Sequence, residues 1–459
     1  MANRREFLQT LVAAAAATSL PIQQALAGAD ARSTDSSRLP WKNWSGSQLS
    51  HPAARLAPAT VADLQEQVRS ANGTIRAVGS GHSFSPLVPT DDTLISLNRL
   101  SGLLSHDDDR QQATIGAGTR LGQLGEPLEA VNQALINMPD IDQQTLAGSL
   151  ATATHGTGAG LQCLSANIVA LSLVTAAGDR VHCSPAHNPE LFQAARVGLG
   201  ALGIVTDVTL QNTRPYRLKR VSEWMPIEDI LATAQDTADR YRNFEFFYIP
   251  FSGMGLHDTH ELTEEPLSST GRFDQNDGAR DLQTIRDLIS WSSTLRRQVL
   301  KGILKTIDRE VKVASSWRNY TSNRNVRFNE MEYHLPREDG LKALQEVREV
   351  VERHFPEVFF PFEVRFIKGD DIWLSPFHRR DTLSIAVHRY FEEDYRPLFQ
   401  AVEPIFRKYG GRPHWGKLNS LSGRDFAQLY PHWEDFKTVR RDMDPEGRFL
   451  NSYLRELFA

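Results

Sequence analysis

One stretch combines a strand with a glycine-rich turn: Arg76-Ala77-Val78-Gly79-Ser80-Gly81-His82-Ser83-Phe84-Ser85-Pro86. The apolar and β-branched residues at 74–78 predict the strand, and alternating glycines and hydroxyl residues follow it directly. Such a turn can point several backbone N–H groups into one concavity and hold a diphosphate there. His82 lies inside the turn. The alternative is a surface turn with an incidental histidine, and this stretch alone does not separate the two.

A second stretch of small residues is Leu146-Ala147-Gly148-Ser149-Leu150-Ala151-Thr152-Ala153-Thr154-His155-Gly156-Thr157-Gly158. A backbone with few large side chains can pack directly against a large planar ligand. His155 is either a contact of that ligand or a buried histidine whose ring bonds to neighbouring carbonyls. Its position among threonines and glycines favours ligand contact.

A third stretch, Gly198-Leu199-Gly200-Ala201-Leu202-Gly203, fits the G-x-G-x-x-G dinucleotide fingerprint. That fingerprint requires a strand before it and a helix after it, so that the helix N-terminus meets the pyrophosphate. Here the order is reversed, because 189–197 is typical of a helix and 204–210 of a strand. A Rossmann fold is therefore not expected, and the glycines predict a helix-to-strand turn.

The remaining pattern indicates an α+β protein in two parts. Residues 41–214 alternate short strand-like runs with helices, for example a helix over 61–70 after Thr60 and a helical stretch over 121–133. From about Pro215 the chain is richer in Arg, Glu, Phe and Trp. Strand-like runs there cover 326–334, 358–367 and 382–390, and the polar stretch 264–283 predicts an exposed loop.

The run Pro361-Phe362-Glu363-Val364-Arg365-Phe366 is typical of a strand. Side chains alternate between the two faces of a strand, so Glu363 and Arg365 share one face and the apolar residues pack into a core on the other. A carboxylate beside a guanidinium can hold the hydroxyl groups of a polyol. A surface ion pair is the alternative, and an isolated E-x-R pattern would favour it.

In their order and spacing, the first three stretches resemble the FAD domain of the vanillyl-alcohol-oxidase superfamily. The most similar branch is the aldonolactone oxidoreductases, which includes L-gulonolactone oxidase, D-arabinono-lactone oxidase and alditol oxidase. The segments 41–46 and 444–449 resemble the opening and closing segments of that branch. The resemblance covers Trp41 to the C-terminus. It implies a two-domain α+β fold of the vanillyl-alcohol-oxidase type, with an FAD-binding domain and a substrate (cap) domain.

The resemblance also implies which residues meet the cofactor. His82 matches the histidine that forms a covalent bond to the flavin, a bond that raises the flavin's reduction potential and prevents its loss. The other expected FAD contacts are Gly79, Ser80, Gly81, Ser83, Phe84, Gly148, Ser149, Thr152, His155, Gly156 and Ile204. No metal is expected, because the two cysteines, Cys163 and Cys183, lack a zinc-type spacing.

The run His414-Trp415-Gly416-Lys417 resembles a family motif whose lysine lies near flavin and substrate. Arg365 and Lys417 are then the cations beside the reacting carbon, where they favour an alkoxide-like hydroxyl and negative charge on the reduced flavin. Glu363 is expected to orient the substrate and to accept a proton. The segment 329–334 also resembles a family segment, but the resemblance assigns it no role.

Two residues depart from the family pattern. Pro139 replaces the small residue that is associated with oxygen access in oxidases, and Asp140 occupies a position that often carries serine and contacts substrate. The expected substrate contacts are Asp140, Glu363, Arg365 and Lys417. The expected reaction is oxidation of a hydroxyl-bearing carbon of a sugar lactone or polyol by hydride transfer to flavin N5. Alternatives are a dehydrogenase with a periplasmic electron acceptor instead of oxygen, and a non-catalytic carbohydrate-binding protein.

The N-terminus has the features of an export signal. Asn3-Arg4-Arg5-Glu6-Phe7-Leu8 fits the twin-arginine pattern, a short alanine-rich run follows, and Ala25-Leu26-Ala27 offers a cleavage site. An ordinary amphipathic helix is the alternative. The expected organisation is a signal peptide at 1–27, a linker at 28–40, an FAD-binding domain at 41–214, a substrate domain at 215–430 and a C-terminal segment at 431–459 that returns to the FAD domain.

The sequence also limits the expected cellular location and the expected binding partners. The apolar run near the N-terminus is too short to span a bilayer, so no stable membrane span is expected. The twin-arginine pattern places the protein, as an expectation, in the periplasm or outside the cell. A formal charge of −5 without a long basic run argues against nucleic-acid binding. The two cysteines either pair in an oxidising compartment or remain buried thiols.

Overall fold

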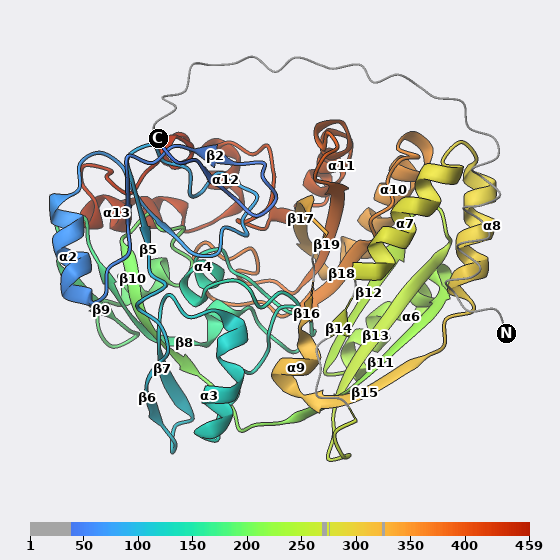
Figure 1. The fold of residues 1–459 in the computed structure, drawn as a ribbon, viewed down its shortest axis with the longest axis horizontal. Helices are drawn as coiled ribbons and strands as arrows, with labels where there is room; N and C mark the ends of the chain where they lie inside the picture. Colours follow the sequence, from blue (N-terminus) through green and yellow to red (C-terminus); the bar gives the residue numbers. More distant parts are fainter. Residues whose placement is uncertain (1–37, 269–272, 275, 324–325) are drawn as a thin grey trace.

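The computed structural model describes residues 38–459, except 269–272, 275 and 324–325. The expected signal peptide and most of the expected linker therefore lie outside the described residues. Figure 1 shows two halves side by side, one with several small sheets and one built on a single large sheet. The mixed content of helices and strands confirms the α+β prediction.

The first half runs from β1 to β10 and holds most of the residues expected to meet the cofactor. Its elements are β1 (Trp41–Lys42), β2 (Leu49–Ser50), β3 (Ala54–Leu56), α2 (Val61–Ser70), β4 (Ile75–Val78), β5 (Thr93–Ser96), β6 (Leu103–Asp107), β7 (Gln112–Gly116), η1 (Leu121–Gln123), α3 (Gly125–Ala130), α4 (Leu146–Ala151), η2 (Leu164–Asn167), β8 (Ile168–Val174), β9 (Arg180–Cys183), α5 (Pro189–Ala195) and β10 (Ile204–Gln211). The parallel sheet β3-β5-β4 lies beside the antiparallel sheet β6-β7-β10-β8-β9.

The second half begins two residues after Pro215. Its elements are β11 (Arg217–Pro226), α6 (Ile227–Arg240), β12 (Asn243–Ile249), β13 (Met254–Leu262), β14 (Phe273–Asp274), α7 (Asn276–Ile289), α8 (Ser293–Leu304), β15 (Glu310–Ser315), α9 (Ser316–Tyr320), β16 (Ser322–Asn323), β17 (Phe328–Pro336), α10 (Arg337–His354), β18 (Phe362–Ile367), β19 (Thr382–Tyr390), α11 (Arg396–Lys408) and β20 (Arg412–Pro413). Eight of these strands form one antiparallel sheet in the order β15-β11-β13-β12-β18-β19-β17-β20.

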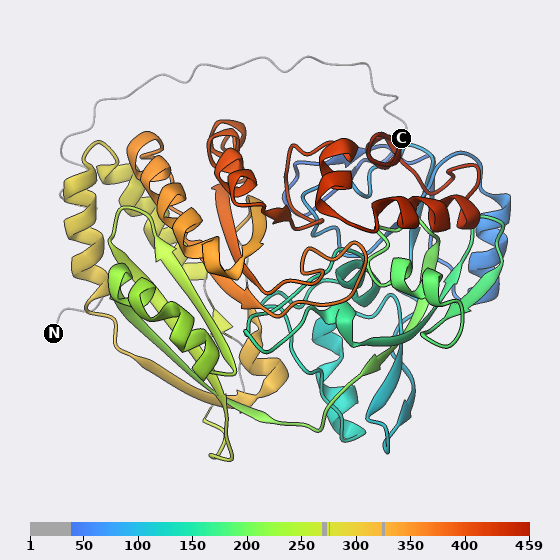
Figure 2. The same ribbon diagram turned by 180° about the vertical axis from the view of Figure 1, so that it is seen from behind.

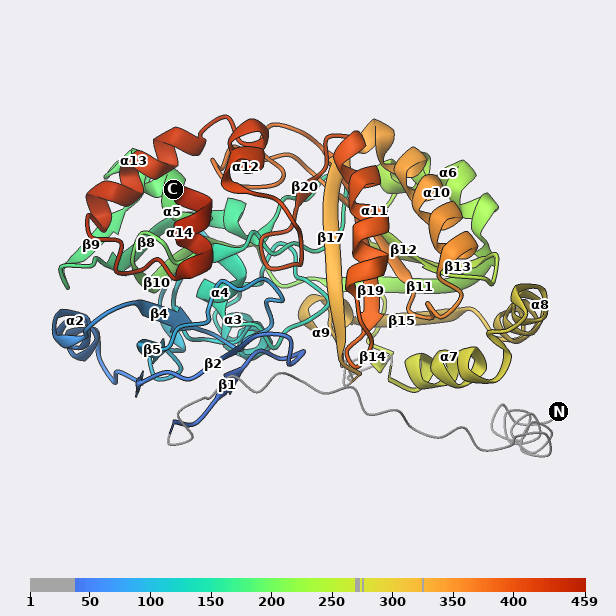
Figure 3. The same ribbon diagram turned by 90° about the horizontal axis from the view of Figure 1, so that it is seen from above.

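The two faces of this large sheet differ in character. One face carries apolar side chains such as Phe246, Phe366 and Ile385, which α6, α10 and α11 cover. The opposite face is buried but polar, and its cross-strand neighbours are Arg220, Asp258, Glu245, Glu363, Arg365, Ser384, His388, Glu330, Glu332 and His334. Figure 3 shows α10 and α11 on one side of the sheet and α7 and α8 on the other. Buried polar side chains need partners, so this face marks a functional region.

The C-terminal helices α12 (Gly423–Leu429), α13 (Trp433–Met443) and α14 (Ser452–Phe458) return to the first half. Figure 2 shows them in red beside the blue N-terminal elements. Two segments from the second half of the sequence, 368–381 and 414–430, also bury apolar side chains such as Phe377 and Trp415 in the core of the first half. The contribution of the later sequence to the first half is therefore larger than the expected boundary at 430 implies.

Two local expectations differ from the structure. The polar stretch 264–283 is not all loop, because α7 begins at Asn276; Leu282, Ile285 and Ile289 form a narrow apolar stripe that packs against α8. The helical stretch expected over 121–133 is shorter, since it divides into η1 and α3.

The two cysteines are both buried and free, so the second of the two alternatives for them is observed. Among the residues that the structure describes, helices of sufficient length are too polar to cross a lipid bilayer.

Candidate active site

A cavity of about 290 Å³ lies in the first half, between the turn after β4, the helix α4 and the start of β10. Most of the residues that the sequence analysis assigns to the cofactor line it: Gly79, Ser80, Gly81, His82, Ser83, Gly148, Thr152 and Ile204. The turn at 198–203, which connects α5 to β10 as expected, closes another side. The three glycine-rich stretches therefore come together around one space.

Four residues expected to contact FAD lie outside this lining. Phe84 packs on Phe328 in a separate aromatic cluster, and the Ser149 hydroxyl donates to the carbonyl of Leu146 within α4. Gly156 lies against the backbone of residue 138, where a Cβ would be only 2.3 Å from a carbonyl oxygen. His155, the fourth, turns toward the large sheet. The small size of Gly156 therefore serves packing between protein segments.

The lining suits a long, partly planar cofactor such as FAD. Gly81 and Gly200 have φ angles of +68° and +63°, which favour glycine and bring bare backbone to the cavity surface. Apolar side chains such as Leu173 provide a wall for a planar ring. Arg76 is one of the lining residues, and its guanidinium donates to the carbonyls of Leu87, Leu199 and Gly200 at 2.7–2.9 Å. Its buried positive charge favours an anionic group such as a diphosphate.

His82 is held in place by an aromatic neighbour. Its ring stacks on Trp44 with a centroid distance of 5.4 Å. Burial first, and then the charges of Lys417 and Arg120, lower the pKa of His82 to about 4. The imidazole is therefore neutral near pH 7, with a lone pair on one ring nitrogen.

The turn that carries His82 is bonded directly to the segment that carries Lys417. The Phe84 N–H donates to the carbonyl of Gly416 at 2.7 Å, and the Ser85 hydroxyl donates to the carbonyl of Trp415 at 2.6 Å. The Lys417 ammonium lies 5.2 Å from the centroid of the Phe84 ring. Two motifs more than 300 residues apart in sequence thus form one side of the site.

Glu363 and Arg365 lie on the polar face of β18, as the alternation predicts, with Phe362, Val364 and Phe366 in the core on the other face. The Arg365 guanidinium is 2.5 Å from the Glu363 carboxylate. Burial alone would lower the pKa of Arg365, but nearby carboxylates, Glu363 first and then Asp140, raise it well above its usual value. Arg365 is therefore a permanent cation, and Asp140 lies within its electrostatic reach.

Glu245 on β12 is a third carboxyl group beside this pair. Its carboxylate oxygen is 3.9 Å from Arg365. Burial raises the pKa of Glu245 to about 8, and the charge of Glu363 adds to this effect. One of the two neighbouring acids is therefore neutral at pH 7 and can donate a hydrogen bond.

Lys417 lies close to two carboxylates of β17 that had no role predicted from the sequence. Its ammonium forms an ion pair with Glu330 and lies 3.8 Å from Glu332. Burial alone would raise the pKa of Glu330, but Lys417 and His388 hold it well below its usual range. Glu330 and Glu332 fix the position of the ammonium.

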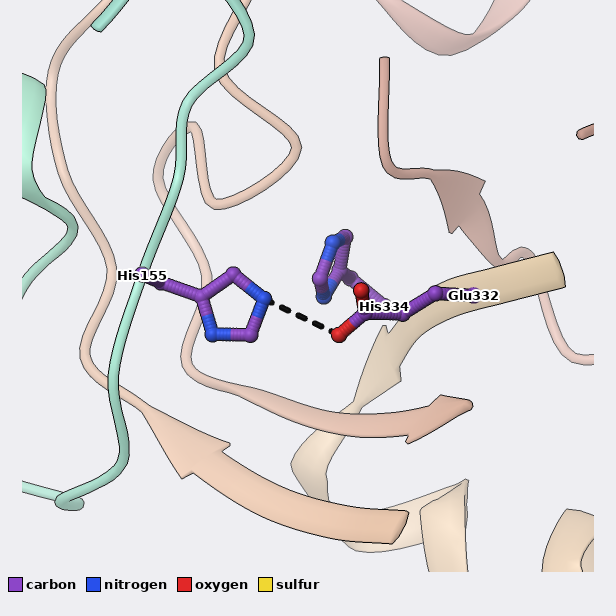
Figure 4. A group of neighbouring side chains, drawn as sticks. All are labelled: His155, Glu332 and His334. Atoms are coloured by element: carbon purple, nitrogen blue, oxygen red, sulfur yellow. Dashed lines mark hydrogen bonds and ion pairs between the residues drawn. The ribbon is translucent and has the colours of Figure 1, made fainter. Parts of the chain in front are cut away.

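His155 bonds to β17 of the other half. Its Nε2 lies 3.0 Å from Glu332 Oε1, and Figure 4 shows the ring pointing toward Glu332 and His334. The rings of His334 and His414 surround it, with centroids 4.9 and 5.8 Å away. Desolvation by burial lowers the pKa of His334 well below its usual value and that of His414 to about 3, so both rings are neutral.

The sequence contains a signal for Glu330, Glu332 and His334, since they alternate along one strand and therefore share a face. Their partners could not be read in the same way. Lys417 and His155 come from distant segments, and only the docking of the two halves brings them to β17.

Two family models match the chain in sequence. The FAD binding domain model matches residues 52–184, and the D-arabinono-1,4-lactone oxidase model matches residues 208–457. The second model begins within β10, close to the point where the two halves meet, and residues 185–207 lie between the two matches. The cavity lies in the half that the FAD model matches, which agrees with its lining.

Similar proteins span nearly the whole chain. L-gulono-1,4-lactone dehydrogenase of Mycobacterium tuberculosis is 37% identical over 91% of this chain and 99% of its own length. Alditol oxidase of a Streptomyces species is 28% identical over 90% of this chain and 98% of its own. A solved structure of a solvent-stable cholesterol oxidase has a TM-score of 0.77 at 17% identity, with 92% of this chain and 98% of that one covered.

The cholesterol oxidase structure shows the fold alone, whereas the two sequence comparisons show the family. The family model covers more than half of the chain, and the mycobacterial relative covers nearly all of it. The chain belongs to the D-arabinono-1,4-lactone oxidase family of FAD-dependent oxidoreductases.

Proposed function

We propose that the protein oxidises a hydroxyl-bearing carbon of an aldonolactone such as L-gulono-1,4-lactone. The observation that carries this proposal is the meeting of Glu363, Arg365 and Lys417 on one buried polar surface beside the His82 turn. The names of the similar proteins, L-gulono-1,4-lactone dehydrogenase and L-gulonolactone oxidase, supply the substrate class. A polyol is the second candidate, because alditol oxidase is also similar to this chain.

In this proposal the charged side chains bind and polarise the substrate. FAD supplies, when bound, the acceptor for the hydride of the carbinol carbon. Arg365 and Lys417 donate hydrogen bonds to the ring and hydroxyl oxygens and stabilise negative charge on the reacting oxygen. Glu363 accepts the hydroxyl proton, and its ion pair with Arg365 holds the carboxylate in position. Asp140 adds a further acceptor for a substrate hydroxyl.

His82 is proposed as the covalent anchor of the flavin. It lines the cavity, its ring is held by Trp44, and its low pKa leaves a neutral nucleophilic nitrogen. A covalent bond suits an enzyme that cannot replace lost cofactor after export. Export itself is proposed from the twin-arginine pattern at residues 3–8, which sends folded proteins to the periplasm. Cell fractionation tests this: an Arg4→Lys/Arg5→Lys variant should accumulate in the cytoplasm.

The electron acceptor is proposed to be a partner other than oxygen. Pro139 is buried where oxidases of the family carry a small residue, and the 37% identical relative is named a dehydrogenase. Steady-state turnover with oxygen and with a dye acceptor decides between the two. Faster turnover with dye supports a dehydrogenase, whereas equal or faster turnover with oxygen, with release of hydrogen peroxide, makes the protein an oxidase.

The substrate proposal is tested by mixing the purified flavoprotein with candidate substrates in the absence of oxygen. Loss of the visible flavin band upon addition of L-gulono-1,4-lactone, at a rate that saturates with concentration, supports an aldonolactone substrate. Reduction by xylitol or another linear polyol alone would move the assignment to an alditol-oxidising enzyme. A flavin that no lactone or polyol reduces would refute both.

A further inference from the structure

Three buried side chains converge where the two halves of the protein meet. His155 follows α4 in the first half, and Glu332 and His334 lie two residues apart on β17 of the second half. All three side chains are at most 3% exposed. One ligand atom from each lies within 4.8 Å of the other two, and Figure 4 shows them turned toward one another.

The contacts of His155 call for a cation on its ring. Its Nδ1 is 2.8 Å from the carbonyl oxygen of Gly156, which can only accept, so Nδ1 carries the proton. In a neutral ring, Nε2 then presents a lone pair. That lone pair faces Glu332 Oε1 at 3.0 Å, and a carboxylate oxygen is also an acceptor. Two acceptors this close require a proton or a metal ion between them.

His334 distinguishes a metal ion from a proton. Neither of its ring nitrogens has a hydrogen-bond partner among the residues that the structure describes, although the side chain is completely buried. An additional proton on His155 would satisfy the contact with Glu332 and leave His334 unchanged. A metal ion between the three groups would take a lone pair from each of them. It would therefore also satisfy the buried His334 ring.

We propose that His155, Glu332 and His334 bind a divalent transition-metal ion of the zinc class. Two imidazoles and one carboxylate are a common zinc donor set, with ligand distances of about 2.0–2.2 Å. Two donors at that distance from one ion can be about 3 Å apart, which matches the separation of His155 Nε2 and Glu332 Oε1. The third donor atom, on His334, lies within 4.8 Å of the other two.

The surroundings of the three residues provide the outer hydrogen bonds typical of metal sites. Metal-binding histidines usually donate their second N–H to a carbonyl or a carboxylate, as His155 does to Gly156. The Ser384 hydroxyl donates to Glu332 at 2.6 Å and fixes the carboxylate. Lys417 faces the other oxygen, Oε2, and has Glu330 as its closer partner, so Oε1 remains directed at the histidines.

Such an ion would bind residues of both halves and hold the halves together beside the active site. His155 and Glu332 are 177 residues apart in sequence, and the bond between them connects the cofactor half to the polar face of the large sheet. The ion would hold β17, and with it the carboxylates that position Lys417. This is a structural role, separate from the hydride transfer, and it does not depend on the identity of the substrate.

Metal analysis of the purified flavoprotein tests the proposal. The protein is dialysed against excess ZnCl₂, desalted, and measured by inductively coupled plasma mass spectrometry, with the flavin absorbance as a check on folding. We expect about one zinc ion per chain in the wild type and loss of that ion in His334→Gln and in Glu332→Gln. His260→Gln is the matched control, because His260 is buried on the same face of the sheet but faces Asp258.

Zinc should also raise the melting temperature of the wild type and leave that of His334→Gln unchanged, since only the site-containing protein gains binding energy. Zinc retained by His334→Gln, or lost from His260→Gln, would overturn the assignment of the ligands. A wild type that takes up no zinc, nickel or cobalt would overturn the proposal itself.

Discussion

The imidazole of His82 stacks on the indole of Trp44, with the two planes inclined by 28°. This contact fixes the ring at the cavity wall, where its neutral nitrogen can bond to flavin. We expect the flavin of the wild-type protein to stay with the pellet after acid precipitation. In His82→Ala the flavin should appear in the supernatant.

The control for this experiment is His106→Ala, which removes an exposed histidine on β6 far from the cavity lining. It should keep flavin in the pellet like the wild type. Flavin that leaves the wild-type protein on precipitation would contradict a covalent bond, even if the protein is yellow before acid is added.

Removing the charge of Lys417 should slow the chemical step. Lys417→Met keeps most of the side-chain volume, and we expect the rate of flavin reduction by substrate to fall by about 10²–10³-fold. Glu330→Gln leaves the lysine but weakens the ion pair that positions it, and should cost up to about 10²-fold. Stopped-flow reduction without oxygen measures both. Lys408→Met, on the exposed surface of α11, should reduce at the wild-type rate.

Replacing Pro139 with alanine should increase oxygen reactivity. The proline is buried, and it replaces the small residue that is associated with oxygen access in oxidases of the family. We expect oxygen-supported turnover of Pro139→Ala to rise relative to wild type, while dye-supported turnover stays the same. A parallel change with both acceptors would indicate an effect on substrate oxidation and contradict a role in oxygen access.

Glu245 should make stability depend on pH. Its folded-state pKa of about 8 lies above its ordinary value of 4.5, as a result of burial first and of Glu363 second. Between these two pH values the folded chain keeps a proton that the unfolded chain loses, so the free energy of unfolding falls as pH rises. Arg365, Asp258 and Arg220 also face Glu245 and modulate the shift.

Glu245→Gln removes this titration and keeps the shape of the side chain. The melting temperature of the variant, relative to wild type, should therefore be higher at about pH 8 than at about pH 5. Differential scanning calorimetry at the two pH values measures the difference. A constant offset would show that Glu245 is ionised in the folded protein.

The two cysteines should be unreactive in the native protein. Both thiols are buried, and burial raises the pKa of Cys183 to about 12, so the reactive thiolate is scarce. A thiol reagent such as DTNB should detect almost no cysteine before denaturation and both cysteines after it, with or without prior reduction. Detection of both only after reduction would reveal a disulfide.

Local sequence patterns predicted the elements that carry the site. The alternation in 361–366 placed Glu363 and Arg365 on one face because strand geometry alone determines that face. The order of helix, glycines and strand around 198–203 ruled out the dinucleotide fold for the same kind of local reason.

Contacts between distant segments were not predictable in the same way. His155 was expected to face the cofactor, but its partner is Glu332, which belongs to a different half. Burial of both polar groups depends on how the halves dock. The sequence did not predict helix α7, because most of its residues are polar and only a narrow apolar stripe packs on α8.

The return of the C-terminus to the first half has a consequence for the order of synthesis. The backbone of β4 donates from Ile75 to the carbonyl of Arg448 at 2.8 Å, and the Arg448 side chain bonds to the carbonyls of Val68, Ala71 and Ala176. On the ribosome, β4, which leads to His82, therefore emerges early, whereas Arg448 emerges only when almost the whole chain has been synthesised. The cofactor domain is the first to be translated and the last to be completed.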